Sequence, residues 1–186
     1  ALPISNLTLS NVTAEAVIGT TGDGHALMAP IIDSACTAVC ANALGAMEAL
    51  NALTLEYCKT REQFGVAIGS FQALQHRMVD MFGACENVKS LLYRAVCSAQ
   101  EGDDDARRSM LALKVMTGRA GRLIGGEAIQ LHGGMGMTDE LSVGFFVKRL
   151  MIINTLFGDA DYHQQLFAKL VNDSVSDQST QDAQAA

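Results

Sequence analysis

Apolar residues recur at three- and four-residue steps along most of this chain, which predicts long helices. The expected helices are one over about 25–58, a second from Phe71 to a stop at Gly102, a third carrying Leu113 to Leu131, a shorter one over 139–154 and a last one over 160–171. Three of these helices approach about 30 residues, and short breaks join them. Helices of this kind pack best as an antiparallel bundle, so the pattern predicts an all-α protein.

The two ends of the chain depart from this helical pattern. The opening segment ALPISNLTLSNVTAEAVIG alternates apolar and polar residues like a strand, at Ile4, Leu7, Leu9 and Val12. We expect residues 1–22 to be a β segment and linker from a longer protein, followed by the bundle over 23–172. The closing segment, 173–186, is polar and lacks aromatic residues, which predicts a disordered tail.

Composition narrows the classes of function. Hydrophobic residues make up 49% of the 186 residues and charged residues 18%, so we expect one domain with a large core. The net charge of −7 argues against a nucleic-acid partner, because phosphate binding needs clustered Lys and Arg. No apolar run reaches the roughly 18 residues of a membrane span, and no signal peptide opens the chain. We therefore expect a cytoplasmic protein without membrane insertion.

Cysteine and histidine usage predicts no metal site. The five cysteines form no CxxC pair, and no second His or Cys stands at metal-ligand spacing from any of the four histidines. All five fall within helical pattern, so we expect buried free thiols in a reducing cytoplasm. They are Cys36, Cys40, Cys58, Cys85 and Cys97.

Two glycine-bearing breaks between the helices carry groups that suit an anionic ligand. In the first, REQFG followed by GSFQ, Arg61 offers a planar fork of donors, Phe64 a flat face and Gln72 both a donor and an acceptor. In the second, QLHGGMGM over Gln130–Met137, paired glycines expose backbone N–H groups. Taken alone, each break is better explained as structure: a solvated arginine with a core-filling phenylalanine, a helix-ending turn, and a hydrogen-bonded His132.

The order of the motifs adds a resemblance that no single motif carries. ALGAMEAL, Y-x-x-x-R-x-Q-F-G, FQALQHRMVDM, AIQLHGGMGMTDE and a helix ending near FG follow one another along the chain. Over about residues 5–170 the chain resembles the C-terminal helical domain of the acyl-CoA dehydrogenase family of flavoproteins. The resemblance implies an antiparallel four-helix bundle after the end of a middle β-domain. It also implies an oligomer, usually a dimer of dimers, with FAD at a subunit interface and acyl-CoA as substrate.

The resemblance also assigns residues to the flavin. Arg61 and Gln72 would contact its pyrophosphate and adenosine half, Phe64 would pack on that half, and Gln130–Gly134 would cradle it from another side. In the family these groups serve the flavin of a neighbouring subunit. The cofactor-binding candidates are Arg61, Phe64, Gln72, Gln130, Leu131, His132, Gly133, Gly134 and Asp159.

The resemblance implies a reaction that removes hydrogen from the α,β-carbons of an acyl-CoA, and this reaction needs a base to take the α-proton. This sequence lacks a base at both positions where family members carry one. Many members carry a glutamate in a Y-E-G-T turn, and alignment on Gly158 puts Phe157 at its place. Other members carry the glutamate on the first helix of the bundle before an arginine, where this chain has Ala35 and Cys36. The aspartate that precedes that arginine by three residues survives as Asp33, a substrate-binding candidate together with Gly158.

Three functions remain open at this point. The chain is a flavin-contributing subunit of a heteromeric acyl-CoA dehydrogenase whose base comes from a partner. Alternatively, it is an active homomeric dehydrogenase with a displaced base, either Asp33, Asp159, Asp161 or a residue outside this sequence, although helix capping explains Asp159 and Asp161 more simply. The third alternative is a non-enzymatic assembly module, because a fold does not fix a function.

Overall fold

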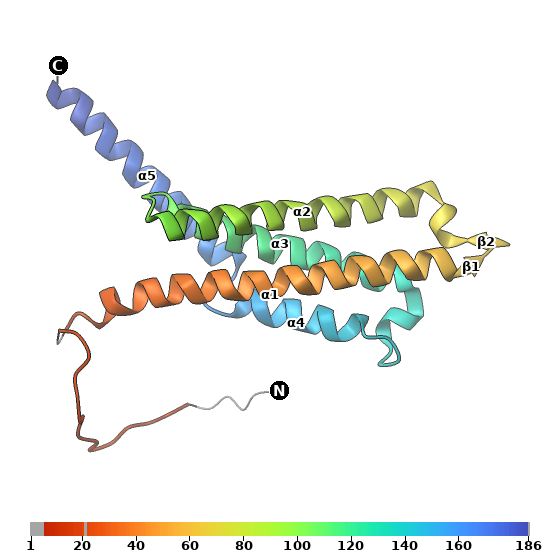
Figure 1. Cartoon of the computed structure of the whole chain (residues 1–186), viewed down its shortest axis with the longest axis horizontal. Helices are drawn as coiled ribbons and strands as arrows, with labels where there is room; N and C mark the ends of the chain where they lie inside the picture. The colour runs from red at the N-terminus through yellow and green to blue at the C-terminus, as the bar shows by residue number, and fades with distance from the viewer. Residues whose placement is uncertain (1–5, 21, 186) are drawn as a thin grey trace.

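Long antiparallel helices dominate the computed structural model, which describes residues 6–20 and 22–185. The elements are α1 (Gly24–Thr60), β1 (Glu62–Gln63), β2 (Val66–Ala67), the 3₁₀ helix η1 (Ile68–Ser70), α2 (Gln72–Glu101), α3 (Ala106–His132), the 3₁₀ helix η2 (Gly133–Met137), α4 (Val143–Thr155) and α5 (Ala160–Ala185). Helices α1 to α4 run side by side with alternating direction, and α5 leaves the bundle at the end opposite the β1–β2 hairpin (Figure 1). The predicted all-α, four-helix bundle is confirmed.

Helix α3 is the centre of the bundle, because it packs against α1, α2, α4 and α5. The core side chains that surround it are fully buried, and each stabilises the fold by about 1.5–3 kcal/mol relative to an exposed position. Small residues on α3 let α4 come close: a Cβ at Gly118 would collide with the Asn154 side chain. The largest core side chains include Met47, Leu50, Met81, Val88, Leu113, Ile124 and Ile153.

Helix α1 is apolar enough that its length and composition alone would also suit a membrane span. Within the described part of the chain it is the one helix that meets this test. Its residues Cys40, Ala43, Met47 and Leu50 lie in the bundle core, although only 22% of its most apolar stretch is buried. The absence of membrane insertion stays a prediction.

Both ends of the chain differ from the sequence prediction. Residues 6–20 contain no strand, and Leu7 is 86% exposed (Ile4 lies outside the described residues). A strand needs a sheet partner, and this segment has none in the described chain. At the other end α5 continues to Ala185 instead of ending near 171. Once a helix is nucleated each added residue gains a hydrogen bond, so polar residues extend it.

Two local predictions also need correction. Helix α4 begins at Val143 rather than near 139, because η2 and a turn occupy the residues before it. Four cysteines are buried free thiols, as predicted, but Cys97 is exposed on the outer side of α2. Burial raises the pKa of both Cys40 and Cys85 to about 11, so these thiols are protonated and unreactive at neutral pH.

Candidate functional site

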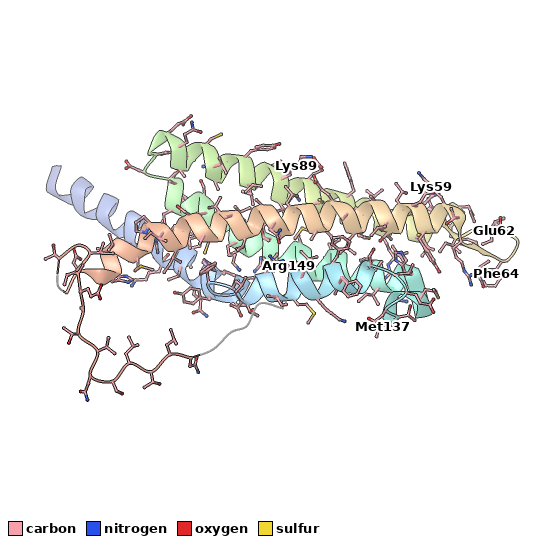
Figure 2. The ribbon with its side chains drawn as sticks, turned by 60° about the horizontal axis from the view of Figure 1, so that its bottom comes forward. Lys59, Glu62, Phe64, Lys89, Met137 and Arg149 are labelled. Carbon is pink, nitrogen blue, oxygen red and sulfur yellow. The ribbon has the colours of Figure 1, made fainter. Side chains whose placement is uncertain are left out.

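A groove of about 410 Å³ lies where the hairpin meets the end of α3. The end of α1, the hairpin, η1, the end of α3 and η2 all contribute to its walls. Figure 2 shows Glu62 and Phe64 of the hairpin at the same end of the bundle as Met137 of η2. The residues that line the groove are Tyr57, Arg61, Gln63, Ile68, Gln130, Leu131, His132, Gly133, Gly134 and Met135.

Arg61 is the cation of this groove. Its backbone is fixed on both sides, since its N–H donates to Tyr57 O at 2.8 Å and its carbonyl accepts from the Ile68 N–H at 2.8 Å. Its guanidinium forms no ion pair with any residue that the structure describes. The groove lies at the C-terminal ends of α1 and α3, where the helix dipoles are negative. An anion in this groove therefore depends on Arg61.

The hairpin turn presents Phe64 away from the bundle. Glu62 pairs with Ala67 and Gln63 with Val66, which leaves Phe64 and Gly65 as a two-residue turn. Both have positive φ, 56° and 79°, as the favoured primed hairpin turns require. A left-handed phenylalanine costs about 1–2 kcal/mol. The residue is 93% exposed, and its ring makes an edge contact with Phe71 at a centroid distance of 6.2 Å.

His132 and Tyr57 form the floor of the groove. The His132 ring is buried, its Nδ1 lies 2.8 Å from Ala128 O, and it stacks on Tyr57 with a centroid distance of 4.4 Å. His132 therefore makes the structural hydrogen bond that its sequence context alone suggested, and its contact with a cofactor stays a prediction. Tyr57 was not among the predicted site residues, although the Y-x-x-x-R spacing puts it one helical turn before Arg61. Gln63 and Met135 lie inside the quoted motifs but were not assigned to the site, and Ile68 lies outside every motif.

The glycine-rich segment is shaped by close backbone packing. Gly133 has φ of 60°, which ends α3 in a conformation that favours glycine. At Gly136 a Cβ would lie 2.8 Å from Ile129 O, so no larger residue fits without displacing backbone. Gly134 has open space at its Cβ position and faces the groove. The segment thus brings main chain to the groove wall, where a side chain would otherwise stand.

The turn that carries position 157 lies between α4 and α5, at the other end of the bundle (Figure 1). Phe157 has φ of 59° and Gly158 has φ of 99°, and a Cβ at Gly158 would collide with the Tyr162 ring. Asp159 Oδ1 accepts a 2.9 Å hydrogen bond from the Tyr162 N–H, which caps α5. Asp161 lies in the first turn of α5, where an acid favours the helix N-terminus.

Asp33 is held by a cation near this turn. Its Oδ2 lies 2.7 Å from Arg107 Nη1, and the pair is partly exposed. Cys36, one turn further along α1, is fully buried, and burial raises its thiol pKa. The first helix therefore presents a paired carboxylate and a protonated thiol at this end, with neither Glu nor Arg at positions 35 and 36.

The predicted site residues thus fall into two regions. Arg61 and Gln130–Gly134 share one groove, whereas Phe64 and Gln72 stand on the hairpin and at the start of α2 without lining it. Asp33, Phe157, Gly158 and Asp159 lie at the opposite end, separated by α4, whose 13 residues span about 20 Å. Asp159, predicted to bind the cofactor with Arg61, is accordingly not part of the groove.

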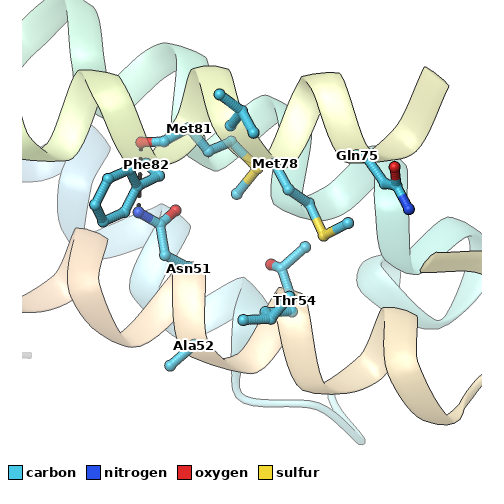
Figure 3. A pocket seen from close by; sticks show the side chains of 9 residues that line it. Asn51, Ala52, Thr54, Gln75, Met78, Met81 and Phe82 are labelled. Atoms are coloured by element: carbon cyan, nitrogen blue, oxygen red, sulfur yellow. Dashed lines mark hydrogen bonds between the residues drawn. The ribbon is translucent and has the colours of Figure 1, made fainter. Parts of the chain in front are cut away.

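A second groove, of about 400 Å³, runs between α1 and α2 (Figure 3). Its walls are mostly apolar and include the exposed side chains of Leu55, Val79 and Phe82. Asn51 Nδ2 donates to Met81 O at 3.4 Å, which leaves Asn51 Oδ1 without a partner among the described residues. Exposed apolar side chains gathered along one groove are consistent with a contact surface for another protein chain.

Comparison with known proteins identifies the family. Residues 22–171 match the family model described as acyl-CoA dehydrogenase, C-terminal domain. The chain therefore belongs to the acyl-CoA dehydrogenase family, as the motif order predicted.

The relatives are longer than this chain. It is 35% identical over 132 residues to the short-chain specific acyl-CoA dehydrogenase of Megasphaera elsdenii, covering 71% of this chain and 34% of that protein. A solved structure of PigA with FAD and proline superimposes with a TM-score of 0.79 at 30% identity, over 83% of this chain and 40% of that one. A solved structure of the Tcur3481-Tcur3483 steroid ACAD superimposes with a TM-score of 0.75 at 30% identity, over 77% of this chain and 40% of that one. The chain spans little more than a third of the relatives' length.

Proposed function

We propose that the full-length protein belongs to an FAD-dependent acyl-CoA dehydrogenase assembly, and that this chain contributes the groove for the pyrophosphate end of the flavin. One observation carries the proposal: Arg61, free of any described ion pair, lines the same groove as Gln130–Gly134. A planar guanidinium beside closely approaching main chain suits a diphosphate. FAD, when bound, supplies the hydride acceptor of α,β-dehydrogenation.

The residues present fit such a dinucleotide. Arg61 would hold the diphosphate, and the main chain at Gly133 and Gly134 would approach it from the opposite wall. Gln63 and Gln130 add polar groups to the same walls. Phe64, exposed at the hairpin turn and outside the groove lining, offers an aromatic face that suits stacking on an adenine. The name of one structural relative, PigA with FAD and proline, agrees with a flavin ligand.

The flavin in this groove would belong to a neighbouring subunit. The groove and position 157 lie about 20 Å apart along α4, so one chain offers two separate surfaces to ligands. The apolar groove between α1 and α2 gives the chain a surface to bury against another subunit, with Phe82 61% exposed. A homo- or hetero-oligomer accounts for both features.

This chain would be the subunit without its own base. Phe157 holds a phenyl ring where the family carries a proton acceptor, and the Asp33 carboxylate is already paired with Arg107. A partner subunit with a competent glutamate would then complete an enzyme that removes hydrogen from the α,β-carbons of an acyl-CoA. The double name of the Tcur3481-Tcur3483 steroid ACAD supports an assembly of unlike subunits.

Replacing Arg61 with alanine in the full-length assembly is expected to lower flavin occupancy by about 10-fold or more, because the helix ends around it repel an anion. The measurement is flavin absorbance per protein after desalting. Lys59→Ala is the matched control: it removes the same charge from the last turn of α1 at a residue that does not line the groove. Equal flavin loss in both variants would argue against a specific diphosphate contact.

Purification of the full-length protein alone and with its family partner separates the alternatives. Flavin and turnover only in the mixed assembly are expected. Flavin and turnover from the chain alone would favour the homomeric enzyme with a displaced base. No flavin in either preparation would favour the assembly module.

A further inference from the structure

Two buried polar side chains hold the backbone that carries position 157. Lys114, on α3 and 1% exposed, donates from Nζ to Ile153 O at 2.9 Å and Asn154 O at 3.0 Å. His163, on α5 and 3% exposed, has Nε2 at 3.0 Å from Phe157 O. The two side chains therefore bind backbone carbonyls on both sides of residues 155–156, the end of α4 and the start of the turn.

These contacts satisfy the carbonyls at the end of α4 and stabilise the backbone conformation of Phe157. The last carbonyls of α4 lack partners within their own helix, and the negative end of the helix dipole favours a cation there, which Lys114 provides. Phe157 is held with φ of 59°, a conformation that a phenylalanine rarely adopts unaided. The His163 hydrogen bond to the Phe157 carbonyl fixes that conformation, since rotating the backbone would break the bond.

The protonation state of His163 follows from its surroundings. Its Nδ1 is buried and has no hydrogen-bond partner among the described residues, so the proton is on Nε2, which donates to Phe157 O. Burial lowers the pKa of His163, and the Phe157 carbonyl opposes that shift. Lys114, Asp33 and Arg107 are the charged groups that act on the ring from α1 and α3. A neutral imidazole is thus the stable donor at neutral pH.

We infer that Lys114 and His163 are positioning residues, which aim the side chain at position 157 whatever its type. The inference rests on the proposed function, because it treats position 157 as the place of the family base. It adds that the backbone scaffold for a base at position 157 is intact in this chain, although the carboxylate is missing. The backbone conformation at position 157 is then fixed by side chains from α3 and α5 rather than by contacts of the residue 157 side chain.

Hydrogen exchange tests the scaffold without any flavin. The amides of Leu156 and Tyr162, bonded to Ile152 O and Asp159 Oδ1, report opening of the turn. In the full-length protein, His163→Leu is expected to raise the exchange rates of both amides by about 5- to 10-fold, because one hydrogen bond that holds the turn is lost. His163→Gln, which keeps an N–H donor, should exchange like wild type, and His76→Leu on the exposed side of α2 serves as the control.

Kinetics test whether the scaffold positions a base. In an assembly carrying Phe157→Glu, adding His163→Leu should lower kcat about 10-fold with KM for acyl-CoA unchanged, and His163→Gln should restore it. Equal exchange and kcat in the Leu and Gln variants would overturn the inference, as would a change confined to KM. Absence of turnover in Phe157→Glu itself, with the exchange result intact, would count against the proposed function and leave the scaffold supported.

Discussion

Phe157→Glu is expected to raise the rate at which acyl-CoA reduces flavin at the chain's own site by about 100-fold or more over wild type. This is the usual contribution of a positioned general base. The turn already holds residue 157 through Lys114 and His163, and Gly158 leaves room beside the Tyr162 ring. A glutamate there would reach the α-proton as it does in family members with this turn. Anaerobic mixing of the flavin-loaded assembly with acyl-CoA, followed by flavin absorbance, measures the rate.

The matched control for this experiment is Phe157→Gln. Glutamine has nearly the shape of glutamate but cannot accept the proton, so its rate should stay at the wild-type level. Equal rates for the Glu and Gln variants, with flavin bound in both, would mean that base loss is not the defect. Cys36, in the place of the family arginine, would then be the next residue to restore.

Lys114→Met is expected to lower the free energy of unfolding by about 2–4 kcal/mol, because it leaves one buried and one partly buried carbonyl without this donor. The methionine keeps a similar stem, so loss of packing adds little. Burial lowers the pKa of Lys114, and removing a partly desolvated charge offsets part of the loss. Chemical denaturation followed by circular dichroism gives the difference between the variants.

Lys148→Met on α4 is the control for this substitution, since that side chain is 69% exposed. Its ion pair with Asp139, at 4.0 Å on the surface, contributes about 1 kcal/mol at most. A Lys114 variant no less stable than the Lys148 variant would contradict the assigned role of the two hydrogen bonds.

The long helices were predictable because their apolar stripes are wide and their ends carry local signals. The first was predicted over 25–58 and spans Gly24–Thr60, and Gly102 ends α2 in the left-handed conformation. The β1–β2 hairpin was not predicted, since strands of two residues are too short for periodicity and Phe64 is an unusual turn residue. Residues 6–20 contain no strand in the described chain, which holds no sheet partner for them, so their assignment to a preceding β-domain stays a prediction.

The family resemblance put Arg61 and Gln130–Gly134 on opposite sides of one ligand, and these residues, far apart in sequence, do line one groove. Their binding of a cofactor stays a prediction. Lys114 and His163 escaped notice because a lone lysine or histidine in a helix is usually solvated. The run LALKVM, apolar on both sides of Lys114, was the available signal that this lysine is buried.

The most direct test of the account is an experimental structure of the full-length assembly with FAD. The account predicts that the pyrophosphate lies in the groove of this chain, within hydrogen-bond distance of the Arg61 guanidinium and beside Gly133 and Gly134, with the flavin ring in a neighbouring subunit. A pyrophosphate bound elsewhere, with Arg61 in solvent or paired to a carboxylate, would contradict it.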